Sequence, residues 1–239
     1  MIYTCSDLHG RYDRYQKLFD IITKEDTLYV LGDSIDRHDD GILILNDIMN
    51  RENVKLILGN HEDFLLRSVF SKNPRERDYM FGIWTRGCNG GAKTFRSLKK
   101  YTDKQLSDLA DYLINCPVFK RITVDGTDYH LSHGSALKSL WDKPSLLYKD
   151  ASAKETDRIL WHSPFYNLLD DGYSPKANYK EDEIYIMGHV PVQRLNLTVL
   201  GIYDNLRLID GGCAFEEDYD SVTSAMLYCL DTQDVYYVR

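Results

Sequence analysis

The sequence lacks any long apolar run, and its charge balance is acidic rather than basic. No stretch of the 239 residues approaches the roughly 18 to 20 consecutive apolar residues of a membrane-spanning helix. The first residues also lack a basic region followed by an apolar signal core, because the acidic Asp7 comes early. With 29 Lys and Arg against 37 Asp and Glu, the formal net charge of −8 disfavours binding to a nucleic acid polymer or a membrane. We therefore expect a cytoplasmic protein that attracts any phosphate-bearing substrate locally.

Cysteine is also too sparse and too scattered to organise the fold or a soft-metal site. The five cysteines are an odd number, and none has the paired spacing of a zinc site or a disulfide framework. Cys5, Cys213 and Cys229 stand in apolar, strand-like runs, where a buried thiol is the simplest interpretation. We expect reduced thiols without a catalytic role.

Apolar runs that alternate with helical periodicity fill the first half of the chain. We predict strands at residues 2–6, 28–31 and 54–58, and helices at residues 12–22, 42–49 and 64–70. This repeated strand and helix order favours a layered α/β fold. Residues 71–101 are less regular and include Pro74 and a glycine-rich turn, which indicates a loop or cap over a site.

The second half is richer in strand signals. Thr102 can cap a helix at residues 103–114, which Pro117 closes. Residues 136–180 read as mixed helix and loop. The pattern predicts strands at residues 120–124, 128–132, 184–187, 206–209, 224–230 and 235–238. A hydrophobic content of 43% can fill a sizeable core, and no repeat or linker divides the chain, so we expect one domain over residues 1–239.

Six of the expected strands run directly into a side chain that can bind a metal. Each of these side chains has a glycine nearby, and loops beyond the ends of parallel strands are where α/β sheets bind ligands. The polar residues that follow the six strands are Asp7 and His9, Asp33, Asn60 with His61, His133, His189, and Asp210.

Each of these residues has a purely structural explanation when it is taken alone. Asp7 can cap a helix, His189 can be a hydrogen-bonded core histidine, and the glycines can be turns. The six strand ends together are harder to explain, because carboxylates and imidazoles near buried strand ends are costly without a cation. Oxygen and imidazole donors without thiolates suit Mn²⁺, Fe or Zn²⁺. We expect two such ions, which together can activate a hydroxide for attack on phosphorus.

The order of the motifs resembles the calcineurin-like metallophosphoesterase superfamily. The motifs are Asp7-Leu8-His9, residues 32–37 (GDSIDR), residues 59–62 (GNHE), His133-Gly134 and Gly188-His189. Arg37 directly after the second motif, with Asn-His-Glu in the third, is similar to the phosphoprotein-phosphatase branch. That branch includes compact bacterial and phage serine/threonine phosphatases and symmetrical diadenosine tetraphosphatases. The resemblance extends from residue 7 to about residue 212.

The resemblance implies a four-layer fold, with a central β-sandwich flanked by helices and a dimetal site at the strand ends. It also implies roles. Asp7 and His9 would hold the first metal, Asp33 would bridge, and Asn60, His133 and His189 would hold the second. His61 would protonate the leaving oxygen while Asp36 orients its ring. Arg37 would grip the phosphate, and Asp210 would support the ligands from behind.

Three departures from the family pattern affect these expectations. Proline follows His189-Val190 where many superfamily members have a further histidine, which favours the phosphatase branch over a phosphodiesterase. His162 follows Trp161 where close relatives tend to have the arginine of a second phosphate clamp, so we expect His162 to bind phosphate more weakly and with more pH dependence. His38 replaces a glycine that commonly follows Arg37.

Three functions remain open at this point. The first is hydrolysis of phosphoserine and phosphothreonine in proteins; the alternative is a symmetrical bis(5'-nucleosyl)-tetraphosphatase, with a phosphorylated small molecule as substrate. The third is a metal-holding interaction module without turnover, suggested by His162. Four aromatic residues fit either stacking on adenine or core packing. They are Trp84, Trp141, Trp161 and Tyr166.

Overall fold

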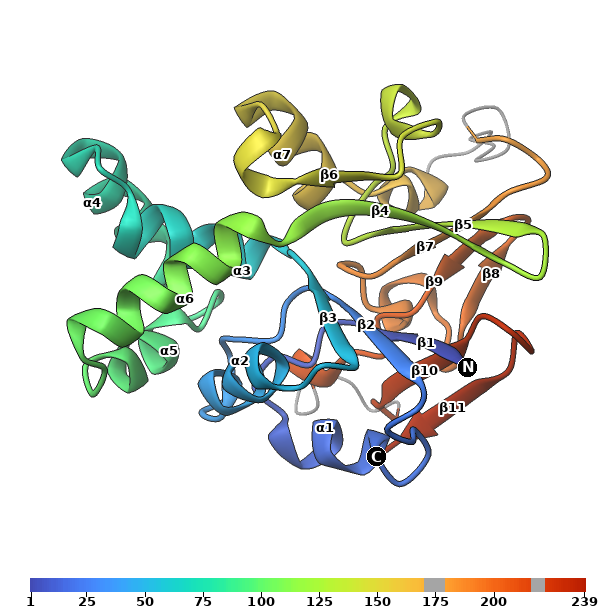
Figure 1. Ribbon diagram of the computed structural model, residues 1–239, viewed down its shortest axis with the longest axis horizontal. Helices are drawn as coiled ribbons and strands as arrows, with labels where there is room; N and C mark the ends of the chain where they lie inside the picture. Colours follow the sequence, from blue (N-terminus) through green and yellow to red (C-terminus); the bar gives the residue numbers. More distant parts are fainter. Residues whose placement is uncertain (170–178, 216–221) are drawn as a thin grey trace.

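Two mixed β-sheets form the centre of the molecule (Figure 1). The structure is a computed structural model that describes residues 1–169, 179–215 and 222–239. The first sheet has the order β11-β10-β1-β2-β3, and its strands are β1 (Ile2–Cys5), β2 (Thr27–Leu31), β3 (Val54–Ile57), β10 (Ala225–Cys229) and β11 (Val235–Val238). The second has the order β6-β4-β5-β7-β9-β8, with β4 (Pro117–Val124), β5 (Thr127–Ser132), β6 (Ser145–Leu147), β7 (Ile184–Met187), β8 (Gly201–Tyr203) and β9 (Leu206–Leu208).

Each sheet contains three neighbouring parallel strands, and this arrangement prepares the site. β1 pairs with β2 and β2 with β3 in parallel, and β5, β7 and β9 are parallel in the same way. The carboxyl ends of three parallel neighbours lie at one edge of a sheet, so the residues after them come together. The Tyr129 hydroxyl of β5 donates to the Leu230 carbonyl at the end of β10, 2.8 Å away, and this bond joins the two sheets.

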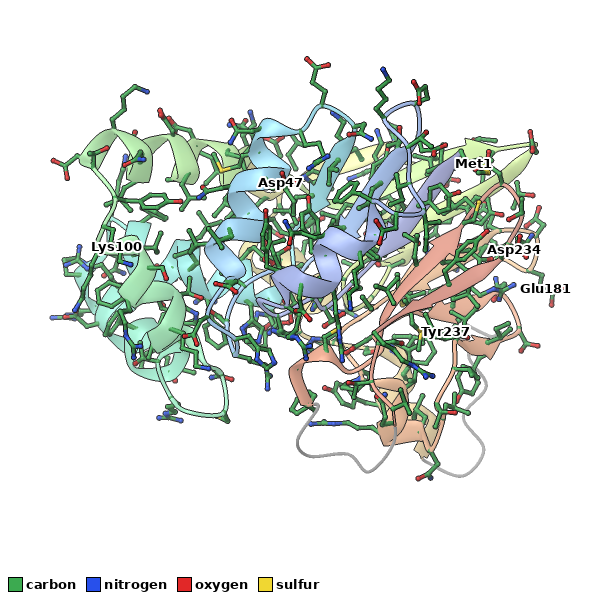
Figure 2. All side chains as sticks on the ribbon, turned by 90° about the horizontal axis from the view of Figure 1, so that it is seen from below. Met1, Asp47, Lys100, Glu181, Asp234 and Tyr237 are labelled. Carbon is green, nitrogen blue, oxygen red and sulfur yellow. The ribbon has the colours of Figure 1, made fainter. Side chains whose placement is uncertain are left out.

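Helices flank the sheets, as the sequence predicts. Figure 2 shows α1 (Tyr12–Leu18) and α2 (Gly41–Asn50) lying across the first sheet. The Tyr15 hydroxyl joins these two helices by donating to Asp47 at 2.6 Å. On the second sheet, α7 (Ala153–Leu160) lies above β4 and β6 (Figure 1). Within residues 1–169, 179–215 and 222–239, no helix is both long and apolar enough to cross a bilayer.

A further group of helices fills the end of the molecule away from β7–β9 (Figure 1). α3 (Asn60–Leu65) continues into the π-helix η1 (Leu66–Phe70), and α6 (Asp103–Asn115) begins at the Thr102 cap as predicted. Residues 71–101 are not an irregular loop, because they contain α4 (Pro74–Trp84) and α5 (Gly91–Leu98). The Asn73 side chain caps α4, and Pro74 occupies the first helical position, where its missing N–H costs nothing.

The expectation of mixed structure at residues 136–180 agrees with the described part of that segment. It contains the short helices η2 (Lys138–Leu140), η3 (Tyr148–Asp150) and η4 (Pro164–Leu169) as well as β6 and α7, while residues 170–178 lie outside the described residues. Two strands of three residues each, β6 and β8, are absent from the sequence prediction. Both are edge strands, and runs that short have too little alternation to be recognised.

The loops after β2 and β3 cross in direct backbone contact. Gly32 has a φ of +80°, and a Cβ atom on it would lie 2.4 Å from the Cα atom of Gly59 and 2.9 Å from Nδ1 of His133. No side chain fits at this crossing. Asp33 and Asn60, which directly follow these two glycines, are thereby brought together.

We predict that Gly32→Ala lowers the free energy of unfolding by at least about 2 kcal/mol, because it adds both a backbone clash and a left-handed alanine. Gly82→Ala is the matched control. Gly82 lies in α4, and a Cβ atom added to it would meet no other atom within 4 Å. Alanine at this position should therefore raise the free energy of unfolding by about 0.5–1 kcal/mol. Urea unfolding of both variants measures the difference. Equal stability of the two variants would contradict the backbone crossing.

Candidate metal centre

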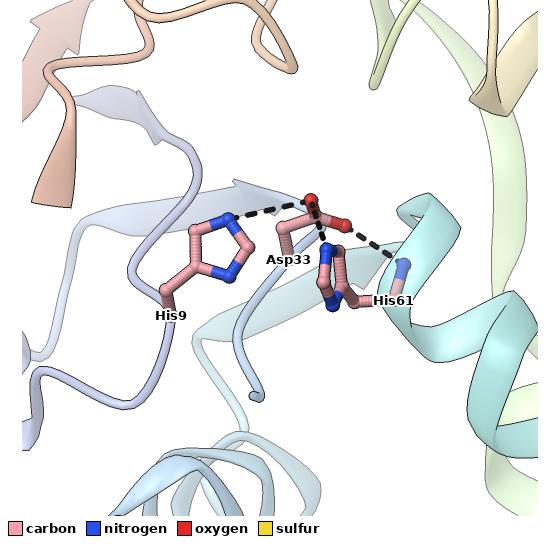
Figure 3. A group of neighbouring side chains, drawn as sticks. All are labelled: His9, Asp33 and His61. Carbon is pink, nitrogen blue, oxygen red and sulfur yellow. Dashed lines mark hydrogen bonds and ion pairs between the residues drawn. The ribbon is translucent and has the colours of Figure 1, made fainter. Parts of the chain in front are cut away.

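Asp33, the first residue after the turn that ends β2, lies at the centre of the cluster (Figure 3). Its Oδ2 atom is 3.5 Å from Nε2 of His9 and 3.8 Å from Nε2 of His61. Its Oδ1 atom accepts the backbone N–H of His61 at 3.0 Å and lies 3.4 Å from Nε2 of His133. One carboxylate therefore contacts residues that follow β1, β3 and β5.

A second set of donors meets on the other side of Asp33. The Asn60 Oδ1 atom lies 2.8 Å from Nε2 of His133 and 2.9 Å from Nδ1 of His189, and these two ring nitrogens are 3.2 Å apart. The structure therefore contains two groups of donor atoms that share Asp33. One is His9, Asp33 and His61, and the other is Asp33, His133 and His189; within each group the donor atoms lie within 4.8 Å of one another.

Asp7 connects the two groups from the end of β1. Its Oδ1 atom is 3.9 Å from Nε2 of His9, and its Oδ2 atom accepts the backbone N–H of His189 at 2.9 Å and the hydroxyl of Ser6. All six residues expected as ligands therefore lie together. The difference from the expectation is that His61, rather than Asp7, completes the first group with His9 and Asp33.

Backbone carbonyls fix the protonation of two of the imidazoles. Nδ1 of His9 lies 3.1 Å from the carbonyl of Ile35, and Nδ1 of His133 lies 2.8 Å from the carbonyl of Leu31. A carbonyl can only accept, so each Nδ1 donates, and Nε2 is the ring nitrogen that faces Asp33. Burial keeps the pKa of His9 well below its usual value, which leaves this ring neutral.

The electrostatics of the cluster favour a bound cation. Burial raises the pKa of Asp7 to about 6, and the nearby Asp33 adds to the rise. Burial alone would lower the pKa of His133, yet Asp33 and Asp7 outweigh it and raise that pKa to about 10. A field that strong stabilises positive charge at this point. The donor set of carboxylate, amide and imidazole, without thiolate, also fits Mn²⁺, Fe or Zn²⁺.

The backbone around the centre is in a left-handed conformation at many non-glycine positions. Positive φ angles occur at Asp7 (54°), His9 (45°), Asp33 (53°) and His189 (71°), and also at Asp36 and Arg37. Such a residue costs on the order of 1–3 kcal/mol, so the surrounding contacts must hold it in place. The residues of the site therefore adopt backbone conformations that they would not favour in isolation.

The buried Glu62 carboxylate supplies part of this restraint. It accepts the backbone N–H groups of Asp33 at 2.9 Å, Ser34 at 2.9 Å and Gly59 at 3.0 Å. Burial and the charge of Asp33 raise the pKa of Glu62 to about 7. Glu62 belongs to the motif at residues 59–62, but no role for it could be predicted from the sequence. Its structural role is to tie the loop after β2 to the start of α3.

Asp36 holds the ring of His61 and is itself held from two sides. Its Oδ2 atom lies 2.6 Å from Nδ1 of His61 and accepts the indole N–H of Trp84 at 2.6 Å, and its Oδ1 atom accepts the Thr94 hydroxyl at 2.5 Å. Burial acts to lower the pKa of His61, but Asp33 and Asp36 outweigh it and raise this pKa above 6.5. Trp84 and Thr94 come from α4 and α5, so the helices found at residues 71–101 position this pair.

A cleft of about 250 Å³ opens over the cluster. Arg37 lines it as expected, and so do Trp161 and Tyr166. Trp84 and Trp141 are buried and do not line it. Three further lining residues were not predicted, since no motif contains them in a recognised role: Asn89, Arg194 and Phe215.

Of three other residues named from the sequence, only Asp210 lines this cleft. His162 does not line it; the side chain is 65% exposed, and its Nε2 atom lies 3.4 Å from the Asp157 carboxylate. Asp210 lines the cleft and accepts the Gly212 N–H at 2.9 Å, and burial raises its pKa well above the usual value. The His38 ring contacts the Cys213 carbonyl at 3.2 Å.

Two relatives in sequence carry the same name. A symmetrical bis(5'-nucleosyl)-tetraphosphatase of Acidovorax sp. (strain JS42) is 26% identical over 188 residues, which cover 77% of this chain and 59% of the relative. The protein of that name from Pasteurella multocida (strain Pm70) is 22% identical over 187 residues, covering 76% and 60%. The chain thus spans less than two thirds of the length of these curated relatives.

Solved structures with two different names share the fold. A putative diadenosine tetraphosphatase superimposes with a TM-score of 0.61 at 13% identity, covering 99% of this chain and 92% of that one. A protein serine/threonine phosphatase from Saccharomyces cerevisiae gives 0.54 at 13% identity, covering 100% and 80%. At these identities the likeness concerns the fold alone. The calcineurin-like phosphoesterase family model, however, matches residues 1–211, and the chain therefore belongs to that family.

Proposed function

We propose that this phosphoesterase hydrolyses symmetrical dinucleoside tetraphosphates with the help of two divalent cations. The observation that carries the proposal is the pair of donor groups that share Asp33 beneath a cleft containing two arginines and three aromatic rings. The names of the sequence relatives support this alternative better than phosphoprotein hydrolysis, which the sequence analysis placed first. The rings of Trp161, Tyr166 and Phe215 offer faces on which a nucleobase can stack.

In this proposal each cation has its own ligands and Asp33 is common to both. Asp7, His9 and Asp33 would hold one ion, while Asn60, His133 and His189 would join Asp33 in holding the other. The bound pair would lower the pKa of water and offset negative charge on the phosphoryl oxygens. We propose Mn²⁺ as the ion, with Fe and Zn²⁺ as the alternatives that the same donor atoms accept.

The chain's own residues manage the phosphate and the proton. Arg37 binds the phosphoryl oxygens with its planar guanidinium. As the oxygen of water bonds to phosphorus and the bond to the leaving oxygen breaks, Nε2 of His61 gives its proton to that leaving oxygen. The other ring nitrogen, Nδ1, keeps its proton for Asp36 at 2.6 Å, so the ring stays aimed at the reaction.

Hydrolysis of phosphoserine or phosphothreonine is the second candidate. The name of one structural neighbour, a yeast serine/threonine phosphatase, suggests it. The proline that follows His189-Val190 fits both candidates, because the phosphatase branch includes both kinds of enzyme. Both candidates use the same metal cluster. They differ in the group on the leaving oxygen, which is a second nucleotide phosphate in one and a protein side chain in the other.

A substrate panel with Mn²⁺ distinguishes the candidates. We expect diadenosine tetraphosphate to be split into two ADP molecules with a kcat/KM at least about tenfold above that for a phosphoserine or phosphothreonine peptide. The reverse ranking would replace the proposal by the second candidate. If the protein binds metal but hydrolyses none of these substrates, the metal-holding interaction module without turnover is the function that remains.

Metal stoichiometry tests the assignment of ligands without any activity. Calorimetric titration of chelator-treated protein with Mn²⁺ should give two ions per chain. Asp33→Asn should lose at least one of them or weaken binding by about 10- to 100-fold, because it removes a shared ligand. His61→Asn should retain both ions. If His61→Asn instead loses an ion, His61 is a ligand and the assignment of Asp7, His9 and Asp33 is wrong.

Asp36→Asn should lower kcat by about 100-fold or more while KM changes little, since the ring of His61 loses the carboxylate that orients it. Asp39→Asn is the matched control. Asp39 is an exposed carboxylate of the same loop, 3.9 Å from Lys93, and should leave kcat within about twofold. Steady-state kinetics on the best substrate of the panel measure both variants. An unchanged kcat for Asp36→Asn would rule out the proposed proton donor.

A further inference from the structure

Two arginines of the cleft contact the same phenyl ring. The guanidinium carbon of Arg37 lies 4.6 Å from the ring centroid of Phe215, and that of Arg194 lies 5.9 Å from it. Both distances are within the range of a cation–π contact. Arg37 comes from the loop after β2 and Arg194 from the short helix η6 (Val192–Leu195), which follows the loop containing His189. Phe215 thus brings together positive charges from distant parts of the chain.

The backbone that carries Arg194 is fixed to the loop that follows β9. The N–H of Val192 donates to the carbonyl of Asp210 at 3.0 Å, and the side-chain amide of Gln193 donates to the carbonyl of Gly211 at 3.1 Å. Val192 and Gln193 are buried, whereas the Arg194 side chain is exposed and lines the cleft. Within residues 1–169, 179–215 and 222–239, no carboxylate forms an ion pair with Arg194. Its guanidinium can therefore pair with an anion in the cleft.

The residue expected to provide a second phosphate contact is elsewhere. His162 is turned toward Asp157 on α7 and lies outside the cleft. The second positive charge beside the metal cluster therefore comes from Arg194. Arg194 enters the cleft from η6, whereas Arg37 enters it from the loop after β2, so the two guanidiniums come from different segments.

We propose that Arg194 is a specificity residue that binds the phosphate next to the one under attack. The inference rests on the proposed function, and it identifies Arg194 as the group that makes the cleft bind polyphosphates more tightly than monoesters. A monoester has one phosphate, which Arg37 and the metal cluster contact. A polyphosphate places a second anionic group beside the first, and the planar fork of Arg194 can bind two of its oxygens.

Kinetics of Arg194→Gln test the proposal. A contact that is the same in the ground state and the transition state should change KM rather than kcat. We expect KM for diadenosine tetraphosphate to rise by about 10- to 100-fold, with kcat within about threefold. KM for p-nitrophenyl phosphate should change by less than about threefold. Arg194→Lys should recover part of the loss, since it restores the charge but not the fork.

A second measurement separates this inference from the proposed function. Tripolyphosphate and orthophosphate are each tested as competitive inhibitors of p-nitrophenyl phosphate hydrolysis at fixed free Mn²⁺. Arg194→Gln should weaken inhibition by tripolyphosphate about 10- to 100-fold and leave that by orthophosphate within about threefold. Arg75→Gln, which removes an exposed arginine on α4, is the control and should change neither constant.

The outcomes are distinct. If the wild type does not cleave the dinucleotide but the inhibition constants shift as expected, the proposed function fails and the role of Arg194 stands. If Arg194→Gln weakens tripolyphosphate and orthophosphate equally, Arg194 grips the reacting phosphate and the inference is overturned. It is also overturned if neither inhibition constant changes.

Discussion

The buried carboxylate of Asp33 is the contact on which the rest of the site depends. Its oxygens lie 3.0 to 3.8 Å from nitrogen atoms of His9, His61 and His133, which follow β1, β3 and β5. Both candidate metal groups include Asp33. A carboxylate in such a position is costly unless positive charge or hydrogen bonds compensate it. Parallel strands from two sheets supply that compensation at one point, because their carboxyl ends converge on the same cleft.

Holding Asp33 there requires a backbone that ordinary propensities disfavour. Asp7, His9, Asp33 and His189 all have positive φ, and two glycines let the loops after β2 and β3 touch. Glu62 offsets part of this strain by accepting three backbone N–H groups, and the α4–α5 helices clamp Asp36 behind His61. Rigidity at the centre thus comes from groups that would never touch a substrate, which is typical of preorganised sites.

The sequence predicted the cluster better than it predicted the cleft. Asp7, Asp33, His133 and His189 could be identified because each follows an apolar strand, a pattern that is local in sequence. Whether His162 or Arg194 faces the cleft depends on how α7 and η6 pack against the rest of the molecule. This packing cannot be predicted from the residues around either position. The helices within residues 71–101 were missed because polar residues and a glycine-rich turn hide their short apolar faces.

An acidic protein can attract an anionic substrate if the cleft itself is positively charged. Two cations with Arg37 and Arg194 would make the cleft positive although the chain carries a net charge of −8. That account requires both ions to share Asp33. Anomalous diffraction at the manganese edge from crystals grown with Mn²⁺ tests this most directly. We predict two peaks about 3.5–4 Å apart with the Asp33 carboxylate between them. A single peak, or two peaks that do not both contact Asp33, would contradict the account.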